Sequence, residues 1–263
     1  MNNLDDKVTE VFGIKTNYID YVPTDEFKTI LLIAPGLMDS TFFKEFIPGF
    51  PNYYRFIAPD LPGRGKTEPS EKFNTIDSLA NFCIEFMNKV IGEEKPFCIF
   101  AISYGTAVAN EISRKQTKRI EAVVLGGAGE YLDEPLKTIG KILLLPALIN
   151  DKLTKLYIDV LAKLYKVLND FPRHNAKSLA FQYLSALKYK IDDRFISSSE
   201  AVIINFNLDY IITKNSIIKL KKFYPNHHVI FGEVPHVMSP ENTSIVMKDV
   251  LPKVIDALKW KMP

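Results

Sequence analysis

A serine at a strand-to-helix corner is the first feature of this sequence with a clear chemical use. Ser103 stands at the centre of the pentapeptide AISYG, after the apolar run 97–101 and before a helical pattern that extends to Ile112. A turn this sharp holds its serine in a sparsely allowed conformation, and only Gly or Ala fits two residues to either side. The context predicts an exposed nucleophilic serine, and the simpler alternative is a helix N-cap serine.

Such a serine needs a base within hydrogen-bond distance and an acid that fixes the tautomer of the base. Of the four histidines, His236 lies in a loop just beyond the last apolar strand pattern, and Asp209 follows the strand pattern before it. Loops at these strand ends carry the chemistry of parallel α/β sheets. Glu233 is the alternative acid, because Asp209 could also be a simple turn residue. We therefore expect Ser103, Asp209 and His236 to form a catalytic triad in the chain order serine, acid, histidine.

Acyl transfer also requires backbone N–H groups that stabilise an oxyanion. The amide of Tyr104 is expected to be one donor, since it lies at a helix N-terminus where N–H groups are free. We expect the second donor to be the amide of Leu37, in the loop 34–39 after the first apolar run, with Gly36 permitting the bend. The alternative for this loop is an ordinary strand-to-helix turn.

Short apolar runs alternate with helical patterns along the chain, as a mostly parallel sheet flanked by helices requires. One helical pattern spans residues 76–90, with Thr75 as N-cap and Gly92 as stop, and a last one runs from 241 to 260. Residues 8–22 are expected to form an antiparallel lead-in hairpin. The apolar runs cover residues 29–34, 55–58, 97–101, 122–125, 201–206 and 228–231.

Residues 130–199 depart from this alternation, because they carry helical patterns and no strand pattern over more residues than an ordinary crossover needs. They predict a helical cap inserted into an α/β core made of residues 1–129 and 200–263. Residues 153–168 keep amphipathic spacing, and the run 142–149 is apolar throughout. These side chains either form the cap's own core or line an acyl-binding cleft.

Composition limits the classes of partner and cofactor. With 33 basic and 31 acidic residues, the chain gives no reason to expect nucleic acid or membrane insertion. The start of the chain lacks signal-peptide features and no apolar stretch could span a bilayer, so a cytoplasmic protein is expected. Cys83 and Cys98 lack metal-site spacing and are expected to be buried, and no metal or cofactor is expected. The glycine-rich segments 63–67 and 126–129 lack nucleotide-loop spacing.

These motifs together resemble the alpha/beta-hydrolase family across nearly the whole chain. The stretch DLPGRG, residues 60–65, is close to a common turn of that family and implies a structural loop rather than a catalytic carboxylate. The chain departs from the family where Pro35 replaces a common histidine and Ala101 a usual glycine. Serine at position 103, where dehalogenases and epoxide hydrolases of the family carry aspartate, argues against those two chemistries.

The resemblance implies an acyl-enzyme route, in which Ser103 attacks a carbonyl, His236 takes and returns the proton, and water completes hydrolysis. We expect an esterase or thioesterase acting on a small molecule with an apolar acyl group. C–C bond hydrolysis and acyl transfer use the same triad and remain alternatives, as does a ligand-binding protein without catalysis. The sequence leaves a homodimer open.

Overall fold

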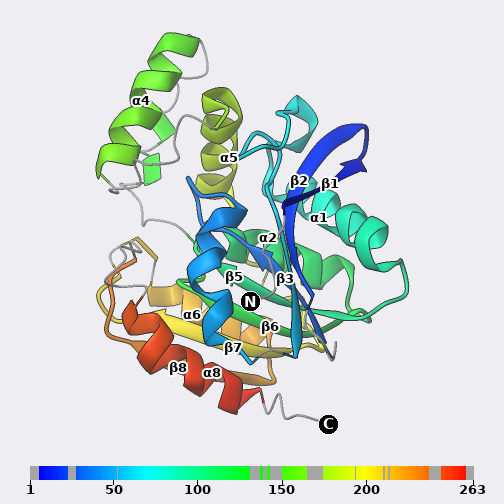
Figure 1. The fold of residues 1–263 in the computed structure, drawn as a ribbon. Helices are drawn as coiled ribbons and strands as arrows, with labels where there is room; N and C mark the ends of the chain where they lie inside the picture. Colours follow the sequence, from blue (N-terminus) through cyan, green and yellow to red (C-terminus); the bar gives the residue numbers. More distant parts are fainter. Residues whose placement is uncertain are drawn as a thin grey trace.

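The eight-stranded sheet at the centre of the molecule confirms the expected fold class (Figure 1). The computed structural model describes residues 6–22, 28–51, 53–130, 137–138, 141–142, 150–164, 174–192, 194–209, 211–212, 214–236 and 244–258. The strands are β1 (Asp6–Val11), β2 (Ile14–Tyr21), β3 (Lys28–Ile33), β4 (Tyr54–Pro59), β5 (Phe97–Ile102), β6 (Ile120–Gly126), β7 (Glu200–Phe206) and β8 (His227–Gly232).

The strand order is β1-β2-β4-β3-β5-β6-β7-β8, and every pair from β4 to β8 is parallel. The predicted lead-in hairpin is present, since β1 pairs antiparallel with β2 and β2 pairs antiparallel with β4. Its two-residue turn, Phe12-Gly13, has positive φ at both positions, as a tight hairpin turn requires. The carboxyl ends of β3 to β8 therefore meet along one edge of the sheet.

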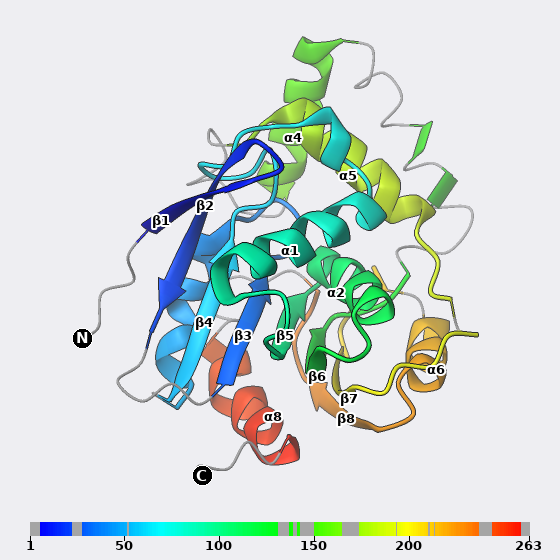
Figure 2. The same ribbon diagram turned by 90° about the vertical axis from the view of Figure 1, so that its right-hand side faces the viewer.

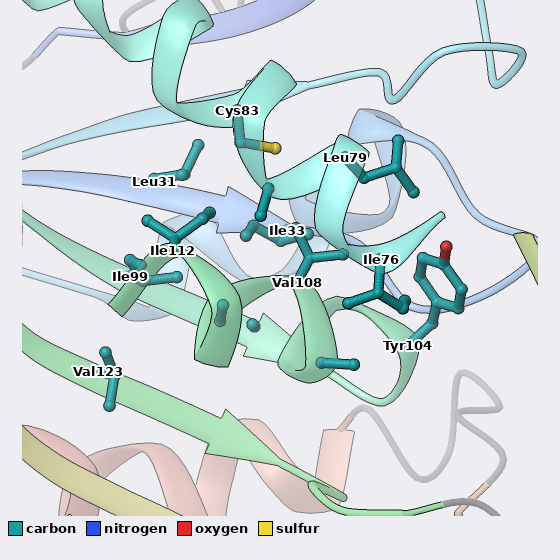
Figure 3. Packing of buried hydrophobic residues seen from close by; sticks show 14 of the residues in the cluster. Leu31, Ile33, Ile76, Leu79, Cys83, Ile99, Tyr104, Val108, Ile112 and Val123 are labelled. Atoms are coloured by element: carbon teal, nitrogen blue, oxygen red, sulfur yellow. The ribbon is translucent and has the colours of Figure 1, made fainter. Parts of the chain in front are cut away.

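Helices on both faces of the sheet enclose two apolar cores, and Figure 2 shows α1 and α2 packed side by side on one face. In Figure 3, Val108 of α2 lies next to Ile33 of β3, and Ile112 of α2 lies near Leu31 and Ile99. The helical elements are η1 (Ser40–Glu45), η2 (Ile47–Gly49), η3 (Glu71–Phe73), α1 (Ile76–Ile91), α2 (Tyr104–Lys115), α4 (Asp151–Leu164), α5 (Ala176–Lys188), α6 (Lys214–Phe223), the π-helical turn η5 (Val246–Val250) and α8 (Leu251–Ala257).

Capping residues define α1 as the sequence predicts. The Thr75 hydroxyl accepts a hydrogen bond from the Ser78 amide, and Gly92 ends the helix with a φ of 100°. The described part of the last predicted helix, residues 244–258, is helical with a π turn inside it. Among the helices that the structure describes, none combines the length and the apolar character needed to span a bilayer.

Among the residues that the structure describes between β6 and β7 are the helices α4 and α5. The amphipathic pattern predicted over residues 153–168 is helical as far as Leu164, and 165–170 lie outside the described residues. Of the apolar run 142–149, only Ile142 is described, and it is exposed. Helix α5 rests on the loop after β4, since the Asn175 amide donates to the Gly63 carbonyl at 2.8 Å. This places α5 above the carboxyl edge of the sheet. The division of the chain into a core and a cap stays a prediction.

Asp20 of β2 is a buried carboxylate that ties the first three strands of the sheet order together. It accepts hydrogen bonds from Arg55 on β4 at 2.9 and 3.0 Å and from Lys7 on β1 at 2.8 Å. Burial raises the pKa of Asp20, but the hydrogen bonds and charges of Arg55 and Lys7 outweigh it and lower that pKa overall. A carboxyl with a lowered folded-state pKa stabilises the fold above its unfolded pKa of about 3.9, and this stability is lost as the pH falls through the folded pKa.

We therefore expect Asp20→Asn to lower the free energy of unfolding at pH 7 by about 1 to 3 kcal/mol, because it removes the negative charge that Lys7 and Arg55 share and replaces one acceptor oxygen by an N–H donor. The difference from wild type should shrink as the pH falls below about 4. Urea unfolding at several pH values measures both effects, with the exposed Asp256→Asn as control. Equal stability of Asp20→Asn and wild type at pH 7 would contradict the assignment.

Candidate active site

Ser103 lies at a strained turn between β5 and α2, with φ 51° and ψ −120°. Its amide donates to the Gly126 carbonyl at 2.7 Å, which fixes the turn against β6. Gly105 lets α2 approach β3 closely, because a Cβ there would lie 2.4 Å from the carbonyl oxygen of Ile33. Ala101 is completely buried, so β5 accommodates a methyl group where glycine is more usual in the family.

The structure brings Ser103, His236 and Asp209 together. The Ser103 Oγ lies 2.6 Å from His236 Nε2, and His236 Nδ1 lies 2.7 Å from Asp209 Oδ2. An ionised carboxylate can only accept, so Nδ1 carries the proton and Nε2 is free to accept from the serine hydroxyl. The His236 and Asp209 side chains are only 8% and 6% exposed, which keeps water from competing for these contacts.

Backbone amides hold the second oxygen of Asp209. The carboxylate Oδ1 accepts from the amides of Ile211 at 2.7 Å and Ile212 at 3.0 Å. Burial raises the pKa of Asp209, but the hydrogen bond and charge of His236 and the two amides lower it below its ordinary value. Asp209 therefore forms a turn and also presents an ionised carboxylate to His236.

Glu233, the alternative acid, makes a different contact. It is exposed, and its Oε1 accepts from the side-chain amide of Asn207. Of the two acids that the sequence offered, the contact with His236 Nδ1 is made by Asp209.

Gly127 makes room for the histidine, a role that the sequence analysis missed. It has a φ of 57°, and a Cβ there would lie 3.3 Å from His236 Cε1 and 2.9 Å from the ring of Phe206. The residue follows Gly126, whose carbonyl holds the Ser103 turn. The glycines at the end of β6 are the signal that could have found this role, since β6 pairs with β5, the strand that ends just before Ser103.

The loop after β3 turns sharply beside the start of α2. The Met38 amide donates to the Pro35 carbonyl at 3.3 Å, and Leu37 has a φ of 63°, which is rare for a residue with a side chain. A Cβ on Gly36 would lie 2.3 Å from the hydroxyl of Tyr183 on α5, so a larger residue there would require the Tyr183 side chain to move. The amide of Tyr104 is the first of α2 and has no intrahelical acceptor. The role of the Leu37 and Tyr104 amides as oxyanion donors stays a prediction.

Asp60 has a structural role, as the resemblance of residues 60–65 to a common turn of the family implied. Its buried carboxylate accepts from the amides of Ser40 at 2.8 Å and Lys66 at 2.9 Å and from the side chain of Asn17 at 3.0 Å. Burial raises its pKa against the lowering effect of these bonds. Gly65 has a φ of 52°, and a Cβ there would lie 2.3 Å from Asp60 Oδ2. The carboxylate organises the loop and takes no part in the Ser103 contacts described above.

The cysteines are buried free thiols, and burial raises the pKa of both Cys83 and Cys98 to about 12. Thiols of this kind are unreactive at neutral pH. Within the described ranges, no group of three or more His, Cys, Asp or Glu side chains could hold a metal ion.

The chain matches the model of a known protein family. The model of the alpha/beta hydrolase family matches residues 30–197. An uncharacterized hydrolase of Saccharomyces cerevisiae is 33% identical over 104 residues, which is 39% of this chain. The match spans 35% of the yeast protein's own length.

Solved structures with this fold cover nearly the whole chain. A hydrolase from Pseudomonas aeruginosa PA01 has a TM-score of 0.78 at 12% identity and covers 97% of this chain and 98% of its own. The enol-lactonase from Burkholderia xenovorans LB400 has a TM-score of 0.75 at 14% identity, covering 96% and 100%. A meta-cleavage product hydrolase from Pseudomonas fluorescens IP01 has a TM-score of 0.66 at 21% identity, covering 96% and 97%. At these identities the likeness establishes the fold alone.

Asp209→Asn should slow the reaction of Ser103 with a fluorophosphonate by about 10³- to 10⁴-fold, because the amide favours the wrong tautomer of His236. Glu233→Gln is the matched control and should react at the wild-type rate. Labelling kinetics followed by intact-protein mass spectrometry measure both variants. The reverse pattern, with Glu233→Gln slow and Asp209→Asn normal, would show that the acid is misassigned.

Gly105→Ala should slow the same labelling and lower the unfolding midpoint, since the new methyl group pushes α2 away from Ile33 and moves the Ser103 turn. We expect a cost of about 1 to 3 kcal/mol in urea unfolding. The matched control is Gly126→Ala, a second glycine-to-alanine change, where a Cβ would make only ordinary contacts of 3.5 Å or more. A Gly105→Ala variant that labels and unfolds like wild type would rule out the close approach of α2 and β3.

Proposed function

The chain belongs to the alpha/beta hydrolase family, and on this basis we propose that it is a serine hydrolase that cleaves carboxylic esters or thioesters through an acyl-enzyme on Ser103. The observation that carries the proposal is the unbroken line of contacts from Ser103 Oγ through His236 to Asp209, at 2.6 and 2.7 Å. A serine hydroxyl becomes a useful nucleophile when a neutral imidazole can accept its proton in this way.

In the proposed acylation step, Ser103 Oγ attacks the substrate carbonyl carbon while its proton passes to His236 Nε2. The imidazolium that forms is stabilised by Asp209, whose lowered pKa keeps the carboxylate ionised. His236 then donates the proton to the departing alcohol or thiol, and the acyl group stays on Ser103. Water then enters and gives a proton to His236 while its oxygen attacks the ester carbonyl of the acyl-enzyme. His236 returns this proton to Ser103 Oγ as the carboxylic acid leaves, which regenerates the serine hydroxyl.

The negative charge of the tetrahedral intermediate falls on the former carbonyl oxygen. We propose that the amides of Leu37 and Tyr104 bind that oxygen, because they flank Ser103 from two neighbouring strand ends. Preorganised donors of this type contribute about 10²- to 10³-fold each to the rate. The positive φ values of Ser103 and Leu37 support this role, since strained backbone is concentrated at functional sites.

Aromatic side chains support an apolar acyl group. Phe206 packs against Gly127 beside the His236 ring, and the ring of Tyr183 lies 6.2 Å from that of Tyr104. Residues 130–199, which supply Tyr183, are proposed to act as a cap over Ser103. An apolar acyl chain would be sheltered there from water.

C–C bond hydrolysis and acyl transfer to an alcohol need the same three residues, so product analysis distinguishes them from ester hydrolysis. A ligand-binding protein without catalysis is less consistent with the site. Binding alone gives no reason to keep Ser103 in a strained conformation with an imidazole at 2.6 Å from its hydroxyl.

Purified wild type should react with a fluorophosphonate to give a single adduct on Ser103 and should hydrolyse short p-nitrophenyl esters. Ser103→Ala should lose both activities, because it removes the nucleophile and leaves the fold intact. The control is Ser198→Ala, which changes an exposed serine whose hydroxyl donates to the Thr117 carbonyl. Adduct formation is located by peptide mass spectrometry. A folded wild-type protein that forms no fluorophosphonate adduct would contradict the serine hydrolase proposal.

A further inference from the structure

His174 lies just before α5 and contacts the loop that carries the proposed oxyanion donor. Its Nε2 lies 3.2 Å from the carbonyl oxygen of Leu37, and its Nδ1 lies 3.0 Å from the amide nitrogen of Gly65. The Gly65 amide can only donate and the Leu37 carbonyl can only accept. These two contacts therefore require a neutral imidazole with its proton on Nε2, which donates to Leu37.

The other end of the same loop is held by Arg64. Its Nη1 donates to the Pro35 carbonyl at 2.9 Å, with a longer contact of 3.5 Å to the Met38 carbonyl. The Arg64 Nε and Nη2 both donate to Gln182 Oε1 on α5, at 3.0 and 2.9 Å. The guanidinium is completely buried and lies over the ring of Tyr104, 4.5 Å from its centroid.

The peptide units on both sides of the Gly36–Leu37 bond are therefore fixed from outside the loop. Arg64 holds the Pro35 carbonyl on one side, and His174 holds the Leu37 carbonyl on the other. The N–H of the unit between them is the proposed donor. Leu37 has an unfavourable φ of 63°, and strain of this kind persists only where the surroundings over-determine the backbone.

We propose that His174 is a positioning residue, which sets the direction of the Leu37 amide by donating a hydrogen bond to the Leu37 carbonyl. This inference rests on the proposed function, because it assigns a purpose to an oxyanion donor. It also ties the reacting centre to α5, since His174 is joined directly to the Asn175 N-cap of that helix. The position of α5 therefore affects transition-state stabilisation through His174 and Leu37, and His174 need not contact Ser103.

Two substitutions test the hydrogen bonds of the two ring nitrogens of His174 separately. His174→Gln retains a donor at the reach of Nε2 and can keep the bond to Leu37. His174→Asn retains an acceptor at the reach of Nδ1 and can keep only the bond from Gly65. The matched control is His228→Asn, an exposed histidine on β8 that faces Glu200. Each variant is assayed by p-nitrophenyl butyrate hydrolysis, by fluorophosphonate labelling and by thermal unfolding.

We expect His174→Asn to lower kcat and the maximal labelling rate by about 10- to 100-fold, as displacement of a catalytic group by about 1 Å does, with KM nearly unchanged. His174→Gln should recover most of this loss, although both variants lose one of the two hydrogen bonds. A purely structural role would make the two variants equal in rate or make rate follow the unfolding temperature. If either result is found while the wild type is active, the role of His174 is contradicted and the proposed function stands. A wild type that fails to label on Ser103 would instead remove the proposed function, and this inference with it.

Discussion

The close approach of α2 to β3 at Gly105 is the constraint on which the rest of the site depends. Because no side chain separates the helix from the Ile33 carbonyl, the chain can reverse direction within a single residue, Ser103. This turn places the hydroxyl at the edge of the sheet and the Tyr104 amide beside it. The position of Ser103, the proposed nucleophile, is therefore set by backbone packing, and the side chains around it only need to reach that point.

Parallel pairing explains how distant segments meet there. The strands from β3 to β8 end at one edge, so the loops that carry Leu37, Ser103, Asp209 and His236 converge although these residues lie up to 199 positions apart in the sequence. Different contacts hold each of these loops in place. Backbone amides hold Asp209, Gly127 leaves space for His236, and the buried Asp60 and Arg64 shape the loop that lies beneath α5.

The parts of this arrangement that depend on local pattern could be predicted from the sequence. Apolar runs gave the parallel strands, and Thr75 and Gly92 gave the limits of α1. The choice of Asp209 over Glu233 followed from position after β7, and the structure places Asp209 against His236. Long-range contacts could not be predicted, because nothing in the sequence near His174 or Arg64 indicates a partner in the loop after β3. Helix α6 was also missed, since its apolar positions Ile217, Leu220 and Phe223 are interrupted by lysines.

The most direct test of the account is a crystal structure of the protein after reaction with a fluorophosphonate. The phosphonyl group mimics the tetrahedral intermediate, so its oxygen marks the place where negative charge develops. We predict a phosphorus atom bonded to Ser103 Oγ and a phosphoryl oxygen about 2.7 to 3.1 Å from the amide nitrogens of both Leu37 and Tyr104. An adduct on another residue, or a phosphoryl oxygen that turns away from both amides, would contradict the account.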